Sequence, residues 1–226
     1  MTEDIRLKLR QIPPGYERLS LLHTKHTMNA NQLTKIKDKL CQFCLSIPQN
    51  MTAHEKTSLL YNVVTKCIHY NHDERDMNLR FTYAGPMLTG FGVCMGIAEL
   101  LNILLNACGI ESRVVIGCIT DTENYHAWIQ VRLPDEQGHW TWYHADPTFD
   151  LLENGHSPCF YLKSDSYMLS HEHNWLPERY EPCPRNYAIP QTPNPLLVQR
   201  LCKEFQKMHS PYRQKYIEKR SDVDES

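Results

Sequence analysis

Apolar residues recur at helical spacing in the first third of the chain. From Asn31 they follow a period of three to four residues and stop before Pro48, which predicts one helix. A second periodic segment begins at Thr52, and Glu55 three residues later completes the pattern of an N-terminal capping box. The sequence therefore predicts two helices before residue 70.

The clearest helical pattern covers residues 94–107. Gly109 provides its C-terminal stop, and aliphatic side chains line one side of the segment: Ile97, Leu100, Leu101, Leu104 and Leu105. The preceding residues 71–90 are polar and interrupted by glycine and proline, so we expect a loop that leads to Cys94.

Three strand-like segments follow this helix. Residues 112–119, 125–133 and 139–146 are rich in valine, isoleucine and aromatic side chains, and polar turns separate them. Helices followed by an antiparallel meander predict an α+β fold rather than alternating β-α-β units.

Composition narrows the classes of function. The net charge is -2 and the basic residues form no stripe, so we predict neither nucleic acid nor a membrane surface as a partner. No run of eighteen apolar residues exists, so no membrane span is expected. The first residues include acids where a secretory signal carries bases, which favours a cytoplasmic location. The nine cysteines form no dense disulfide framework, which favours free thiols.

Cys94 stands where a thiolate is favoured. It opens the predicted helix, and the unpaired N–H groups and positive dipole end at a helix start stabilise an anion. Such positions lower a cysteine pKa from about 8.5 to below about 7. Gly92 and Gly96 leave space for a substrate backbone, and the N–H groups around Cys94 are candidate donors to an oxyanion.

His126 and Asp146 are candidates for the base and the orienting acid that a cysteine nucleophile requires. They are twenty positions apart, on two predicted strands that an antiparallel turn brings together. An aspartate that accepts a hydrogen bond from an imidazole fixes its tautomer and stabilises its cation. His144 is a rival to His126, because strand alternation places it on the same face as Asp146.

Four motifs together resemble the core of the transglutaminase-like superfamily, which includes transglutaminases, bacterial cysteine peptidases and amidases, and peptide N-glycanases. They occur in the family's order: Gly92-Val93-Cys94, the run from Gly109 to Gly117, His126-Ala127-Trp128 and Asp146-Pro147-Thr148. The resemblance covers roughly residues 55–175. It implies a papain-like fold, in which a helix bearing the nucleophile packs on an antiparallel sheet bearing the other two residues.

The resemblance also implies a domain organisation. The transglutaminase-like catalytic core, with N-terminal helices, then occupies residues 31–180. Residues 1–30 form an N-terminal extension, and residues 181–226 form a proline-rich segment followed by a helix and a tail.

The chemistry implied by the resemblance is acyl transfer on a protein or peptide amide through a thioester, without a cofactor. Cys94, His126 and Asp146 would be nucleophile, base and orienting acid. The triad fits a peptidase, a deamidase or a transglutaminase. The chain lacks the extra β-sandwich domains and calcium sites of animal transglutaminases, which favours hydrolysis. The alternative is a catalytically silent protein-binding module of the same superfamily.

Two aromatic residues are further candidates. Papain-like enzymes often add a side-chain oxyanion donor upstream of the cysteine, and Tyr83 is the best substitute for the usual Gln or Trp, with plain packing as its alternative. Trp128 either shields the His–Asp hydrogen bond, shapes the substrate channel or packs in the core.

Two patterns raise the question of a metal. The CQFC stretch at residues 41–44 has ligand spacing, but no second CxxC accompanies it. The HEH stretch at residues 171–173 lies in a polar segment without a carboxylate–histidine pattern around it. We therefore expect no bound metal.

Overall fold

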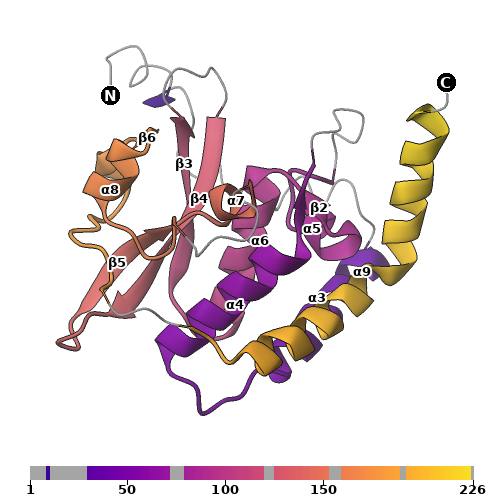
Figure 1. The fold of residues 1–226 in the computed structure, drawn as a ribbon, viewed down its shortest axis with the longest axis horizontal. Helices are drawn as coiled ribbons and strands as arrows, with labels where there is room; N and C mark the ends of the chain where they lie inside the picture. Colours follow the sequence, from indigo (N-terminus) through magenta and orange to yellow (C-terminus); the bar gives the residue numbers. More distant parts are fainter. Residues whose placement is uncertain are drawn as a thin grey trace.

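The computed structural model describes residues 9–10, 30–71, 79–119, 125–152, 159–188 and 192–224. In these ranges an antiparallel sheet lies beside a layer of helices (Figure 1). This arrangement confirms the predicted α+β class. Nearly all of the proposed extension over residues 1–30 falls outside the described residues, so that boundary stays a prediction.

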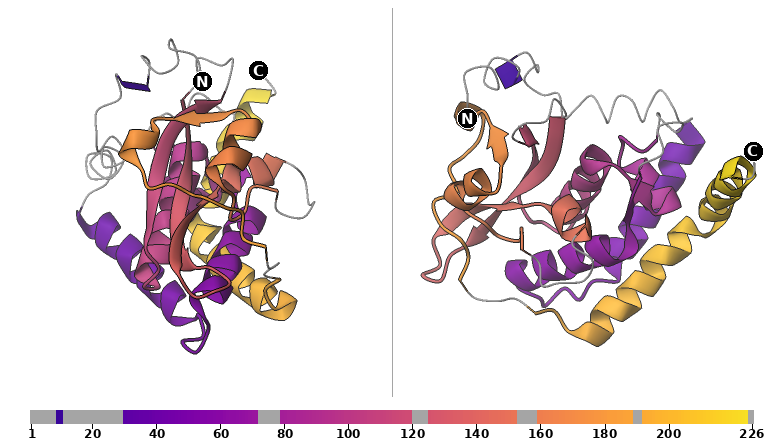
Figure 2. Two further views of the ribbon diagram at one scale, coloured as in Figure 1. Left: turned by 90° about the vertical axis from the view of Figure 1, so that its left-hand side faces the viewer. Right: turned by 45° about the horizontal axis from the view of Figure 1, so that its top comes forward.

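The long helices belong to the helical layer: α3 (Ala30–Leu45), α4 (Ala53–Cys67), α6 (Cys94–Ala107) and α9 (Pro195–Asp224). Helix α6 contacts strands β3 and β4, and α3 and α4 contact α6 from the helical layer. The right-hand view of Figure 2 shows α9 running along the outside of this layer. The predicted capping box is present, because Thr52 and Glu55 exchange hydrogen bonds at the start of α4.

The main sheet has the strand order β5-β4-β3-β6, and every neighbouring pair is antiparallel. Its strands are β3 (Ser112–Ile119), β4 (Tyr125–Pro134), β5 (Trp140–Ala145) and β6 (His173–Trp175). The first three match the predicted strands closely. Strand β6 was not predicted, since three residues are too few to show an alternating pattern.

Of the loop predicted over residues 71–90, residues 84–89 are helical, and residues 72–78 lie outside the described residues. Strands β1 (His69–Tyr70) and β2 (Phe91–Gly92) pair in parallel, with Tyr70 opposite Gly92. Helix α5 (Ala84–Thr89) lies between them along the chain and ends at Gly90, whose φ of 78° is left-handed. Pro86 is compatible with this helix because it lies in the first turn, where a missing N–H costs no hydrogen bond.

The remaining described elements are short. They are α7 (Pro147–Leu152), α8 (Asp165–Ser170) and a 3₁₀ turn (Pro177–Arg179). Among the described residues, no helix combines the length and the hydrophobicity that a membrane crossing requires.

Apolar side chains fill both faces of the sheet. Alternate residues of β4 face α6, and in that helix Leu101, Leu104 and Leu105 are fully buried. The opposite face carries a smaller cluster: Val115, Trp128, Phe160, Met168 and Trp175. Gly117 makes this cluster possible, because a Cβ there would lie 2.5 Å from the Trp128 ring and 2.2 Å from a backbone oxygen.

The burial of α6 generates a stability prediction. Leu104→Ala should lower the free energy of unfolding by about 2–5 kcal/mol, because it leaves a cavity under the sheet. Leu45→Ala, at a residue that is 77% exposed, should change it by less than about 0.5 kcal/mol. Urea unfolding followed by circular dichroism measures both values. Equal losses for the two variants would contradict the burial of α6 against the sheet.

Candidate active site

Cys94 is the first residue of α6 and is partly exposed. The first turn of the helix lies directly against the backbone of the preceding segment. A Cβ on Gly96 would lie 2.4 Å from the carbonyl oxygen of Arg80 and 2.7 Å from that of Thr82. The backbone N–H of Val93 also donates to the Arg80 carbonyl oxygen at 3.1 Å. These contacts fix the position of the helix start, and with it the thiol.

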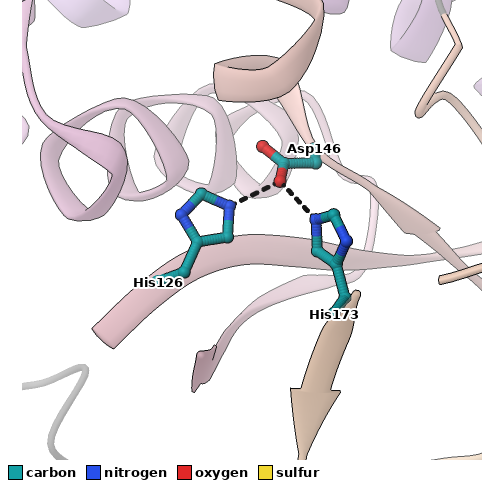
Figure 3. Close-up of side chains that lie close together, drawn as sticks. All are labelled: His126, Asp146 and His173. Carbon is teal, nitrogen blue, oxygen red and sulfur yellow. Dashed lines mark hydrogen bonds and ion pairs between the residues drawn. The ribbon is translucent and has the colours of Figure 1, made fainter. Parts of the chain in front are cut away.

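His126 is the second residue of β4 and is 7% exposed. Its Nε2 lies 2.6 Å from Oδ2 of Asp146 (Figure 3). A second hydrogen bond joins the His126 ring to the Cys94 thiol. Because Nε2 is engaged by the carboxylate, Nδ1 is the nitrogen available to the sulfur. The structure thus brings together three predicted site residues from distant parts of the sequence.

Asp146 directly follows β5 and caps α7. Its Oδ1 accepts the backbone N–H groups of Thr148, at 2.9 Å, and Phe149, at 3.2 Å. Pro147 occupies the first helical position, where no N–H is needed. This local structure gives the Asp-Pro-Thr motif a physical reason. One carboxylate oxygen orients the side chain through the helix start, and Oδ2 remains for the imidazole.

The electrostatics favour a thiolate beside an imidazolium. Burial alone would raise the pKa of Cys94, but the hydrogen bond and charge of His126 and the N–H of Ala127 lower it below the ordinary thiol value. Burial alone would lower the pKa of His126, but Asp146 and Cys94 raise it to about 10. Burial would also raise the pKa of Asp146, and the neighbouring histidines hold it well below its usual range.

Trp128 is fully buried beneath the site. Its ring stacks on His126 with a centroid separation of 5.7 Å and an interplanar angle of 24°. Its Nε1–H donates to Nδ1 of His144 at 2.8 Å. Of the three roles expected for Trp128, its position fits core packing that also shields the His126 ring from water.

His144, the rival to His126, belongs to a different network. Its Nδ1 accepts the Trp128 N–H, so Nε2 carries the proton and donates to Asp165 at 2.8 Å. Burial first, and then nearby cations, lower the pKa of His144 below its ordinary value. His144 is therefore neutral and accepts a hydrogen bond from Trp128. It pairs with Asp165, as His126 pairs with Asp146.

Two clusters in the described ranges have ligating atoms within 4.8 Å of one another: His126, Asp146 and His173, and His144, Asp165 and Cys183. In both clusters the histidine nitrogens that face the carboxylate are hydrogen-bond donors to it. A metal ion would need the lone pairs of these nitrogens in place of their protons.

Two tyrosines lie near the start of α6. Tyr83 is buried before α5, and its backbone N–H donates to Glu99 at 2.9 Å. Burial and then the Glu99 charge raise the pKa of the Tyr83 phenol. Tyr70 pairs with Gly92, two residues before Cys94, and burial and then the charge of Cys94 raise the pKa of the Tyr70 phenol. The oxyanion role expected for Tyr83 stays a prediction, and Tyr70 is a second candidate that sequence reasoning missed.

Tyr61 and Asp150 support the segment that carries Asp146. The Tyr61 hydroxyl lies 2.9 Å from the Asp146 carbonyl oxygen and 2.5 Å from Oδ2 of Asp150. Burial raises the pKa of Asp150 to about 6, against the hydrogen bonds that it accepts. Tyr61 has one O–H proton and can donate to only one of these oxygens. Both contacts are hydrogen bonds when Asp150 is protonated and donates to the Tyr61 oxygen, while the Tyr61 O–H donates to the Asp146 carbonyl.

His173 was considered in the sequence only as part of a possible metal-binding stretch. The structure places its Nε2 2.9 Å from Oδ2 of Asp146, the same oxygen that His126 contacts (Figure 3). His171 ends α8 and is exposed, whereas His173 begins β6 and is buried. Strand alternation would place these two histidines on one face, so the HEH stretch gave no local signal that separates them.

The comparison with protein families matches residues 42–147 to the transglutaminase-like superfamily. A comparison with curated proteins gives no match. The matched segment runs from the end of α3 to the first residue of α7, and so includes Cys94, His126 and Asp146. Together with the α+β fold, this match assigns residues 42–147 to the transglutaminase-like superfamily.

Proposed function

We propose that the protein catalyses cysteine-dependent acyl transfer on a protein or peptide amide. Cys94 is the nucleophile, His126 transfers the proton and Asp146 orients His126. The observation that carries this proposal is the continuous set of hydrogen bonds from the Cys94 thiol through His126 to the buried Asp146. The lowered pKa of Cys94 and the raised pKa of His126 support a thiolate–imidazolium pair at neutral pH.

In the first half of the reaction, the Cys94 sulfur forms a bond to the amide carbonyl carbon. The carbonyl oxygen becomes an oxyanion, for which the N–H groups at the start of α6 are the donors. When this intermediate collapses, the C–N bond breaks and the leaving amine takes the proton from Nδ1 of His126. The product is a thioester on Cys94, with His126 neutral and still hydrogen-bonded to Asp146.

In the second half, an acceptor attacks the thioester carbon and gives a proton to His126. Collapse of this second intermediate releases the acyl product and restores the thiolate and the imidazolium. Water as acceptor makes the reaction a hydrolysis, by a peptidase or deamidase. A lysine amine makes it a transamidation, as in a transglutaminase.

The first test is a product analysis. A peptide library is incubated with the protein, with and without a primary amine, and mass spectrometry separates cleavage, deamidation and cross-linking. Cys94→Ala should abolish turnover and keep the fold, because the variant lacks the nucleophile. Asp146→Asn should lose about 10⁴-fold and keep a residual rate.

The matched control is Cys41→Ala, which removes an exposed thiol in α3 and should keep full turnover. Activity of Cys94→Ala equal to that of the wild type would contradict the proposal. If the wild type turns over no peptide and Cys94 is no more reactive than the other thiols, the chain is the silent binding module.

A second test follows the alkylation rate of Cys94 by iodoacetamide against pH. The rate should rise at a pH below the ordinary thiol pKa, level off, and rise again near the His126 pKa of about 10. The first step marks formation of the thiolate, and the second marks loss of the proton from His126. Peptide mapping assigns the label to each cysteine.

His126→Ala should convert this two-step profile into one step at or above the ordinary thiol pKa, since burial and the charge of Asp146 then oppose only the N–H of Ala127. The thiols of Cys108 and Cys202 serve as internal controls, because hydrogen bonds from Cys44 and Cys67 lower their pKa without His126. Their labelling should be the same in both proteins. A single step for Cys94 in the wild type would contradict the ion pair.

A further inference from the structure

His173 lies in β6, beyond the segment that matches the superfamily. It is fully buried, and its ring faces His126 across the Asp146 carboxylate, with centroids 5.5 Å apart (Figure 3). Oδ2 of Asp146 therefore accepts from two histidines, at 2.6 Å from His126 and 2.9 Å from His173. His126 and His173 thus share one oxygen of the Asp146 carboxylate.

The hydrogen-bond partners of His173 determine its protonation. Nδ1 lies 2.8 Å from the backbone carbonyl oxygen of His171, which can only accept. Nε2 lies against the carboxylate of Asp146, which is ionised and also only accepts. Both ring nitrogens of His173 therefore carry protons, and the ring is an imidazolium.

The surroundings of this cation are mostly aromatic. The rings of Trp128, Phe149 and Phe160 pack around it, with centroids 4.7–5.3 Å away. The titratable groups that face it are Asp146, His126 from β4, and His144 from β5, whose proton affinity the charge of His173 lowers. Asp146 is thus the anion that balances His173, and it also balances protonated His126.

We propose that His173 is a positioning residue of the active site: a buried cation that shares Oδ2 of Asp146 with His126 and limits how strongly the carboxylate retains the His126 proton. This inference rests on the proposed acyl transfer. In that reaction His126 must hold a proton beside the thiolate and then release it to the leaving amine. Asp146 supports the first requirement, and the positive charge of His173 supports the second.

The sign of the effect follows from the charges. Removing a cation makes the surroundings of Cys94 and His126 more negative, which favours the protonated form of each group. Both steps of the Cys94 alkylation profile should therefore move to higher pH when His173 is replaced by a neutral residue. A loss of packing alone would weaken the His126–Asp146 contact and bring the two steps closer together.

The test variant is His173→Gln, whose side-chain amide keeps an N–H donor for Asp146 without the charge. The matched control is His171→Gln, because His171 is exposed and contributes only its backbone carbonyl to His173. In His173→Gln both steps should shift upward by about one pH unit, and in His171→Gln neither step should move. Peptide mapping again restricts the readout to Cys94.

The outcomes separate this inference from the proposed function. If the wild type lacks the low-pH step, the proposed function fails. If the wild type shows it and His173→Gln leaves both steps unchanged, the inference about His173 is overturned and the proposed function stands. Should His173→Gln not fold, ¹⁵N spectra of the wild-type ring decide: both His173 nitrogens should be protonated at neutral pH, and a neutral ring would overturn the inference.

Discussion

The hydrogen bond between His126 and Asp146 is the interaction on which the rest of the site depends. A carboxylate that is fully buried is costly unless charged or polar partners compensate for its lost hydration. Asp146 has four such partners, two backbone N–H groups on Oδ1 and two histidine rings on Oδ2. The ionised acid in turn holds His126 as a cation, and the cation favours the thiolate of Cys94. Asp146 therefore stabilises the Cys94 thiolate indirectly, through the positive charge of His126.

The fold supplies this arrangement through elements that are also structural. Because Gly96 has no side chain, the start of α6 can lie directly against the backbone of residues 80–82. Because Gly117 has no side chain, the Trp128 ring can lie over β3, where it packs against the His126 ring. The start of α7 orients Asp146. The site is thus built on packed helices and strands, where side-chain positions are better defined than on loops.

Local patterns predicted most of the fold and most of the residues that meet in the candidate site. The bounds of α6 and β3 were correct because glycine stops and β-branched runs are local signals, and the capping box at Thr52 was visible in four residues. Cys94, His126 and Asp146 were recognisable by their motifs. What the sequence could not show depends on contacts between distant segments. The pairing of β6 with β3 brings His173 to Asp146, and the pairing of β1 with β2 brings Tyr70 toward Cys94.

The most direct test of the account is the titration of the His126 ring by ¹⁵N nuclear magnetic resonance, in the wild type and in Asp146→Asn. The account predicts that both ring nitrogens of wild-type His126 stay protonated from neutral pH until the pH approaches 10, and that Asp146→Asn lowers this pKa. A wild-type His126 that titrates near the ordinary histidine pKa of about 6.5, with no change in Asp146→Asn, would contradict it.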